Sequence, residues 1–182
     1  MSRRAVLFLA VAPLLAALPL TADAGLSRTG SSDVSFTAYG PAGMSIHGTT
    51  SELAVADGGQ SVVVTVPVKT LVTGIGVRDK HMRDALEADK YMTAALTVVK
   101  SALRFPEAGA DTTVDAEGTM TLHGQTRAIK FHYTARRDAT TYAVKGSARV
   151  HMADFGITPP SYLGISVKPD VDVEVKFSVV DK

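Results

Sequence analysis

The chain contains no cysteine among its 182 residues. This absence excludes disulfide bonds, thiolate metal sites, cysteine nucleophiles and attachment of a lipid to an N-terminal cysteine. The sequence also lacks a Walker A motif, a GxSxG motif and the Rossmann glycine pattern, so nothing indicates a nucleotide site or a serine hydrolase. Acidic and basic residues nearly balance, with a net charge of +1. This charge gives no reason to expect a nucleic acid or an anionic membrane as a partner.

The longest hydrophobic run lies at the N-terminus. Arg3 and Arg4 precede an apolar stretch over 5–20, and Ala22-Asp23-Ala24 supplies the small-x-small pattern of a cleavage site. The stretch is shorter than the roughly 20 residues that a spanning helix needs. We therefore predict that residues 1–24 are a cleaved signal peptide of either the Sec or the twin-arginine type. Residues 25–182 then form one domain, periplasmic or secreted, with no transmembrane segment in the mature chain.

Apolar and polar residues alternate through most of residues 25–182, which is typical of strands with one buried face. In "TVDAEGTMTLH" (113–123) and "AIKFHYTA" (128–135), alternation on either side of Gly124-Gln125 predicts a hairpin. Only one segment, 79–88, has apolar residues at helical spacing. In all we expect eight strands, within 34–39, 44–56, 60–70, 93–105, 113–123, 128–135, 142–152 and 171–180.

Eight antiparallel strands can pack as a sandwich or close into a barrel, and alternation alone does not decide between the two. In a barrel the apolar faces point inward, so Val, Ile, Met, Phe and Tyr line the lumen. Such a lumen accommodates a long hydrocarbon rather than a sugar or a nucleotide. The candidate lumen residues, which we expect to contact a hydrophobic ligand, are Phe36, Ile46, Val64, Leu71, Met120, Phe131, Tyr133, Phe155, Tyr162 and Phe177.

The segment "TGIGVRDKHMRDALEADKYM" gathers acids, bases and an imidazole within a few positions. Acid–base catalysis by Asp79 and His81 is one interpretation, but residues two apart on a helix point in different directions. We favour a surface helix at the mouth of a barrel, held by ion pairs, because Arg83 has an acidic residue four positions away on either side. A third interpretation is an anionic headgroup bound by Arg78, His81 and Arg83, since arginine matches the geometry of phosphate.

Histidines are scattered singly, and none forms an HxH, HxxxH or HExxH pattern with another. Spacing therefore gives no evidence for a metal site, and we predict neither a metal nor a cofactor. Three histidines fall at an expected turn or on polar strand faces, where we expect them to be exposed to solvent: His123, His132 and His151.

Three blocks of the sequence resemble the YceI-like family. They are "TGIGVRDKHMRDALEADKY" (73–91), "GTMTLHGQTRAIKF" (118–131) and "ADFGI" (153–157), in the order that the family has them. The resemblance implies an all-β fold, a lipocalin-like eight-stranded antiparallel β-barrel with one short α-helical insertion. It also implies a periplasmic protein that binds a polyisoprenoid or similar long lipid in the lumen, without catalysis. The family's usual proline after "KY" is Met92 here, which leaves the ligand's identity open.

These observations predict a non-enzymatic binding protein with a hydrophobic small molecule, a polyisoprenoid-type lipid, as its partner. The alternative is a stress-response or protein-interaction module whose barrel is filled. It would pack its lumen with Met120, Phe131, Tyr133 and Phe177, and would expose an apolar patch near 155–163. The sequence does not indicate the oligomeric state.

Overall fold

The computed structural model describes residues 25–162 and 165–182, together with the side chains of all of these except Tyr162 and Ile165. The predicted signal peptide, residues 1–24, lies outside the described residues. Eleven strands are present in the described part of the chain. They are β1 (Leu26–Tyr39), β2 (Ser45–Thr50), β3 (Ala54–Asp57), β4 (Ser61–Pro67), β5 (Thr93–Val99), β6 (Asp111–Leu122), β7 (Gln125–Asp138), β8 (Thr141–His151), β9 (Ser161–Tyr162), β10 (Ile165–Ser166) and β11 (Asp170–Asp181).

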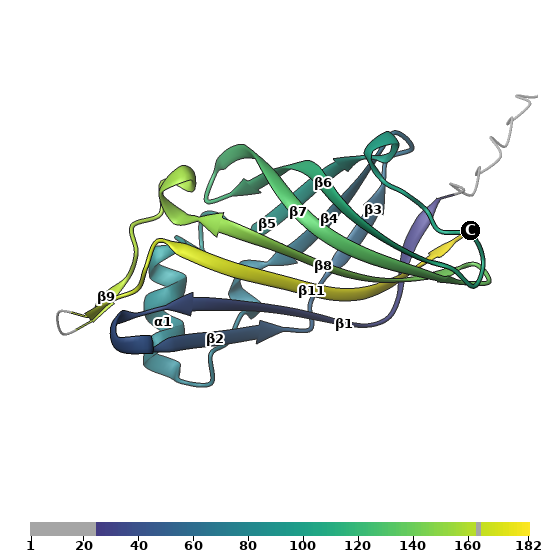
Figure 1. Ribbon diagram of the computed structural model, residues 1–182. Coiled ribbons are helices and arrows are strands. Elements are labelled where there is room, and N and C mark those ends of the chain that lie inside the picture. Colours follow the sequence, from purple (N-terminus) through teal and green to yellow (C-terminus); the bar gives the residue numbers. More distant parts are fainter. Residues whose placement is uncertain (1–24, 163–164) are drawn as a thin grey trace, which may run out of the picture.

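Nine of these strands form one antiparallel sheet in the order β2-β1-β11-β8-β7-β6-β5-β4-β3. A flat sheet of this size would be about 38 Å wide at the usual strand spacing. The edge strands β2 and β3 are joined only by residues 51–53, and a connection of this length spans at most about 14 Å. The two edges must therefore lie near each other, and the sheet curls into a barrel-like shell (Figure 1).

Two contacts link the edges of the curled sheet. Thr49 in β2 exchanges backbone hydrogen bonds of 2.8 and 3.0 Å with Val72, which follows β4 and the 3₁₀ turn η2 (Val68–Thr70). At the other end of the shell, the side chain of Asp57 in β3 accepts a hydrogen bond of 2.8 Å from the backbone N–H of Leu26 in β1. These contacts cover sheet edges that would otherwise expose unpaired backbone groups.

The prediction of an all-β barrel with one helix is confirmed, but the main sheet has nine strands rather than eight. The difference lies in 44–56, which we expected to be a single strand. Residues 51–53 break it, because the Thr50 hydroxyl accepts a hydrogen bond from the Glu52 N–H and turns the chain. This break divides the segment into β2 and β3 and sends the two halves to opposite edges of the sheet.

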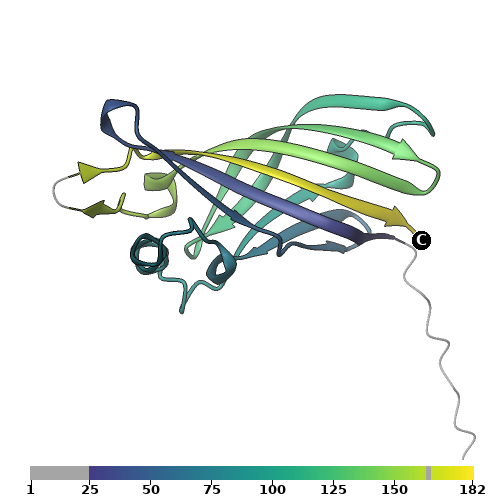
Figure 2. The same cartoon turned by 90° about the horizontal axis from the view of Figure 1, so that it is seen from below.

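Helix α1 (Gly76–Ala85) lies at the same end of the shell as the turn between β1 and β2 and the hairpin β9–β10 (Figures 1 and 2). We expected a helix over 79–88, so the observed helix starts and ends earlier. It stops because Glu87 adopts a left-handed backbone conformation with a φ of 43°. The remaining 3₁₀ turns are η1 (Pro41–Gly43), η3 (Lys100–Ala102) and η4 (Met152–Phe155).

The predicted hairpin forms between β6 and β7, with Leu122 paired to Gln125. Its two-residue turn is His123-Gly124 rather than the expected Gly124-Gln125. Both turn residues have positive φ, 50° and 71°, as a type I′ turn requires. This turn matters for the site, because it points His123 back toward the helix end of the shell.

Candidate functional site: an apolar cavity

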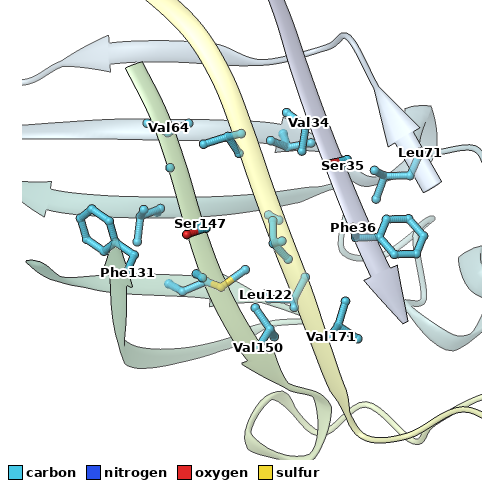
Figure 3. A pocket seen from close by; sticks show the side chains of 18 of the residues that line it. Val34, Ser35, Phe36, Val64, Leu71, Leu122, Phe131, Ser147, Val150 and Val171 are labelled. Carbon is cyan, nitrogen blue, oxygen red and sulfur yellow. The ribbon is translucent and has the colours of Figure 1, made fainter. Parts of the chain in front are cut away.

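The curled sheet encloses a cavity of about 630 Å³. Side chains from strands far apart in the sequence point into it, among them Phe36 from β1, Val64 from β4 and Phe131 from β7 (Figure 3). The volume falls within the range of about 300–1,000 Å³ that is typical of small-molecule sites. The inward faces of the strands therefore line a space and do not meet in a solid core.

The cavity lining is almost wholly apolar. Among the described residues no aspartate, glutamate, lysine, asparagine or glutamine lines it, and its two charged residues are Arg78 and Arg104. The hydroxyl of Tyr133 is occupied, since it accepts a hydrogen bond of 2.6 Å from the Arg104 N–H and donates one of 3.3 Å to the Arg104 carbonyl. A buried polar ligand would find few partners here, whereas a hydrocarbon needs none.

Eight of the ten predicted lumen residues line the cavity: Phe36, Ile46, Val64, Leu71, Met120, Phe131, Tyr133 and Phe177. Phe155 does not, although we expected it to. It is buried in a cluster with Val150 and Ile157, because η4 ends at Gly156 in a left-handed turn that places the ring behind the lining. Tyr162 lies in β9, and its side chain is outside the described residues.

Small residues on the strands of the wall leave room for free space in the lumen. Ala148 in β8 stands opposite Phe131 in β7 and Val173 in β11, and all three line the cavity. Gly48 in β2 pairs with Phe36, and a Cβ atom at Gly48 would lie only 2.3 Å from that ring. The alternation of apolar and polar residues predicted which side chains face inward. The volume of the cavity depends on these small residues and could not be predicted from that alternation.

At the helix end, two of the three predicted headgroup residues, Arg78 and His81, line the cavity. Arg83 does not line it, and its Nε is buried without a hydrogen-bond partner. No salt bridge joins Arg83 to Asp79 or Glu87 among the described residues, although the charge of Arg83 helps to lower the pKa of Asp79. Lys80 pairs with Asp84 instead, with 2.6 Å between Nζ and Oδ2.

Asp79 has a structural environment that the acid–base interpretation did not anticipate. It is buried, and its Oδ1 accepts hydrogen bonds from the N–H and the hydroxyl of Thr73, at 2.7 and 2.6 Å. These bonds, chiefly that of the hydroxyl, hold the pKa of Asp79 below its ordinary value against the opposing effect of burial. The carboxylate thus stays ionised and fixes the chain that leads into α1, so it is already engaged and is not a free catalytic base.

His123 is the residue that sequence reasoning missed. We expected it to be solvent-exposed, but only 12% of its side chain is accessible. Its Nδ1 lies 3.0 Å from the carbonyl oxygen of Phe155, its Nε2 lies 3.3 Å from Glu87 Oε1, and its ring packs edge-on against Tyr91. Gly124 allows this packing, because a Cβ there would lie 2.5 Å from the Tyr91 ring.

The three sequence blocks that resemble the YceI-like family therefore meet at one point. Glu87 and Tyr91 belong to the first block, His123 to the second and Phe155 to the third. Together they fasten the segment after α1 to the β6–β7 hairpin and to η4, beside the helix end of the cavity. In the sequence, His123 before Gly124 indicated a hairpin turn. It did not indicate that this turn faces the helix end of the shell.

The end of the shell opposite α1 is narrowed by packing. Leu103, after η3, contacts two clusters of buried side chains, one around Leu26 and Tyr142 and one around Ala116 and Tyr133. Phe105 lies edge-on to Tyr142, with 5.7 Å between ring centroids. At the helix end the lining residues Ile75 and Val77 are 46% and 57% exposed, and Phe105, which lines the cavity at the other end, is 45% exposed.

Within residues 25–162 and 165–182, no group of three or more His, Asp or Glu side chains is arranged to hold a metal ion. In the same ranges no helix is long and apolar enough to cross a membrane. His132 and His151 are partly exposed and pair with Asp115 and Asp170, at 2.9 and 2.7 Å, on the outer face of the sheet.

The fold and the site define a class of protein in which a curled antiparallel sheet encloses an apolar cavity and a short helix lies at one end of it. The model of the YceI-like domain family matches residues 27–179. The chain belongs to this family.

Sequence and structure comparisons agree with this assignment. UPF0312 proteins of Vibrio cholerae serotype O1 are 32% identical over 124 residues, in an alignment that covers 64% of this chain and 61% of theirs. Among solved structures, a polyisoprenoid binding domain from Saccharophagus degradans, implicated in plant cell wall breakdown, is 20% identical with a TM-score of 0.74. That alignment covers 87% of this chain and 99% of the domain.

Two further structures share the fold. BcnA of Burkholderia cenocepacia is 16% identical with a TM-score of 0.64, over 81% of this chain and 95% of that one. The YceI protein of Campylobacter jejuni is 16% identical with a TM-score of 0.56, over 75% of this chain and 85% of that one. At these identities the likeness concerns the fold alone.

Proposed function

We propose that this chain is an exported, non-enzymatic protein that holds the tail of a long-chain isoprenoid or similar lipid in its lumen. The observation that carries the proposal is the cavity of about 630 Å³, which no carboxylate, amide or lysine of the described residues lines. The description of the Saccharophagus degradans domain as polyisoprenoid binding supports the same ligand class.

The energetics favour a long tail over a short one. Burial of one CH₂ group is worth about 0.8 kcal/mol, whereas association costs an estimated 4–15 kcal/mol. A tail of about six carbons would contribute only about 5 kcal/mol, while one of about twenty would contribute about 16 kcal/mol. A lumen with so few polar partners therefore binds usefully only a ligand with many buried carbons.

The ligand's polar group would lie at the helix end of the cavity. Arg78 and His81 line the cavity there, so they are the residues that would meet a polar or anionic headgroup. The opposite end is narrowed by the packing of Leu103 on two clusters of buried side chains, which favours entry with the tail first. Arg83 is not part of this site.

The surroundings of the candidate catalytic groups support a non-enzymatic role. Asp79 is buried, and its Oδ1 accepts two hydrogen bonds from Thr73. Histidine and carboxylate side chains are the usual acids and bases of catalysis; among the described residues the cavity lining contains His81 but no carboxylate. We expect a bound lipid to be recovered with its mass unchanged.

Native mass spectrometry of the protein purified from its own host tests the proposal. We expect a lipid to copurify, and delipidated protein to bind geranylgeraniol. A preparation that repeatedly carries no lipid and binds neither geranylgeraniol nor a fluorescent long-chain fatty acid would refute it. N-terminal sequencing of the same preparation tests export, since cleavage of the predicted signal peptide leaves Gly25 as the first residue.

Two matched substitutions on β8 locate the ligand. Ala148 lines the lumen, so Ala148→Phe places a ring in the cavity, and we expect affinity for geranylgeraniol to fall at least about tenfold, since about two displaced CH₂ groups suffice. Ala143 lies on the outer, exposed face of the same strand, so Ala143→Phe should bind normally. Equal binding by both variants would place the lipid outside the lumen.

A further inference from the structure

The segment that leads into α1 exposes apolar side chains at the mouth of the cavity. In the mouth segment, residues 72–77 ("VTGIGV"), the exposed fractions of Val72, Ile75 and Val77 are 44%, 46% and 57%. Met44, from the turn between β1 and β2, is 38% exposed and, like Ile75 and Val77, also lines the cavity. The apolar surface of the lumen thus continues without interruption onto the outside of the protein.

Not all of the exposed apolar residues near the mouth are part of the cavity lining. Val72 and Met92 do not line the cavity, yet they are 44% and 63% exposed. Met92 lies beside η2, which precedes the mouth segment, since its carbonyl oxygen accepts a hydrogen bond from the Val68 N–H. Apolar patches of this kind on a folded protein commonly mark a surface that another body covers.

Positive charge flanks the mouth segment on both sides. Residues 68–83 contain four basic side chains, Lys69, Arg78, Lys80 and Arg83, and Asp79 as the one acidic residue. Asp79 is buried and bound to Thr73, so it presents no charge outward. Lys69 and Lys80 pair with the exposed Asp89 and Asp84, and such surface pairs are weak enough to exchange for other anions.

We propose that the mouth segment docks on an anionic lipid bilayer, with Val72, Ile75 and Val77 inserted among the headgroups and the flanking cations on their phosphates. This inference rests on the proposed function, because a protein that carries a lipid must meet the bilayer that supplies or receives it. Docking at the mouth lets the tail pass from the bilayer to the lumen along a continuous apolar surface, so it never crosses water.

The observations favour a bilayer over a protein partner. The exposed apolar residues lie on a short glycine-containing segment and not on a broad flat face, and they adjoin the opening through which a lipid would move. Each cation near an anionic membrane strengthens binding about fivefold. The overall charge of the chain gave no hint of such a partner, since the burial of Asp79 becomes visible only in the fold.

The first experiment uses the absence of tryptophan from the chain. Val72→Trp introduces one fluorophore at the mouth, and Val99→Trp introduces one at an equally apolar site near the narrowed end, where Val99 is 56% exposed. With vesicles of equal parts phosphatidylglycerol and phosphatidylcholine, we expect a blue shift for Val72→Trp alone. No shift for Val72→Trp, or equal shifts at both sites, would overturn the proposal.

The second experiment measures cosedimentation of the mature protein with the same vesicles. Val72→Asp removes apolar contact and adds a charge that the anionic surface repels, so binding should weaken about tenfold. Val99→Asp is the matched control and should bind as the unmodified protein does. Raised salt and pure phosphatidylcholine vesicles should both weaken binding. Equal cosedimentation by the two variants, or capture of a protein in place of vesicles, would overturn the proposal.

Binding of geranylgeraniol to the same variants in solution separates this inference from the proposed function. Val72 does not line the cavity, so Val72→Asp should bind the free lipid normally while it loses the vesicles. Lipid binding without docking by the unmodified protein would refute the membrane surface alone. Docking without lipid binding would refute the carrier function and leave the docking surface standing.

Discussion

Asp57, in the edge strand β3, links that strand to β1 on the other side of the sheet. Its replacement tests how the shell is closed. Only 6% of this side chain is exposed. Its Oδ2 accepts hydrogen bonds from the Leu26 N–H at 2.8 Å and from Lys100 Nζ at 2.6 Å, and its Oδ1 accepts one from the Gly59 N–H at 2.9 Å. In Asp57→Asn, one of the two oxygens becomes an NH₂ group that faces these donors.

The cost of Asp57→Asn follows from that geometry. At least one donor loses its acceptor, and hydrogen bonds to a charged group are worth about 1.5–3 kcal/mol each. A backbone N–H left buried without a partner adds about 1–3 kcal/mol. Lys100 is 28% exposed and can regain water, so we expect a total loss of about 3 kcal/mol in the free energy of unfolding, measured by urea denaturation.

The pH dependence of the Asp57→Asn effect provides a second measurement. Burial raises the pKa of Asp57, but the hydrogen bonds from Lys100 and the two backbone groups outweigh it and lower the pKa below the ordinary value of 3.8. A carboxylate of this kind stabilises the fold above its unfolded pKa and ceases to do so as pH falls through the folded pKa. The stability difference between the variant and the unmodified protein should therefore shrink below pH 3.8.

Asp89→Asn is the control, because Asp89 also pairs with a lysine but its side chain is 96% exposed. Removing such a surface pair should cost less than about 0.5 kcal/mol. A loss for Asp57→Asn no larger than for Asp89→Asn at neutral pH would refute the view that Asp57 closes the shell.

Substitutions at two further positions, Gly124 and Asp79, test the helix end by urea denaturation. Gly124→Ala should lower the free energy of unfolding by more than about 2 kcal/mol, because its φ is positive and the new Cβ would lie 2.5 Å from the Tyr91 ring. Gly30→Ala is the control: its φ is also positive but the space around it is open, so it should cost about 1 kcal/mol. Equal costs would mean that Tyr91 does not constrain the turn. Asp79→Ala should cost about 3 kcal/mol and Asp79→Asn about 1 kcal/mol, since the amide oxygen can still accept both bonds from Thr73. Because the pKa of Asp79 is lowered, its contribution should persist above pH 3.8 and fall below it; a cost that is independent of acid pH would contradict this.

Alternation of residue types predicted most of the strands because it reports burial directly. Met120 and Phe131 face inward with their neighbours at period two, and the structure places both in the cavity lining. The alternative of a filled barrel is not supported, since Met120, Phe131, Tyr133 and Phe177 surround open space. The described part of 155–163 also shows no exposed apolar patch, because Phe155 and Ile157 are buried.

Charged and turn residues were less predictable, because their roles depend on distant partners. Arg83 has acids at helical spacing, yet Lys80 forms the ion pair and Glu87 lies beyond the end of the helix. His123 was expected in solvent, but the type I′ turn directs it toward Glu87 and Phe155. Nothing local to either residue encodes these contacts.

The sequence by itself determined the strands, the inward faces, the single helix and the resemblance to the family, because each of these depends on residues within one short segment. Tertiary structure alone decided whether the shell closes, how much space it encloses and which end is narrowed. Those properties arise where the edges of the sheet meet, where small residues face aromatic ones, and where the segment at 72–77 remains uncovered. They depend on contacts between residues far apart in the chain, which no local pattern records.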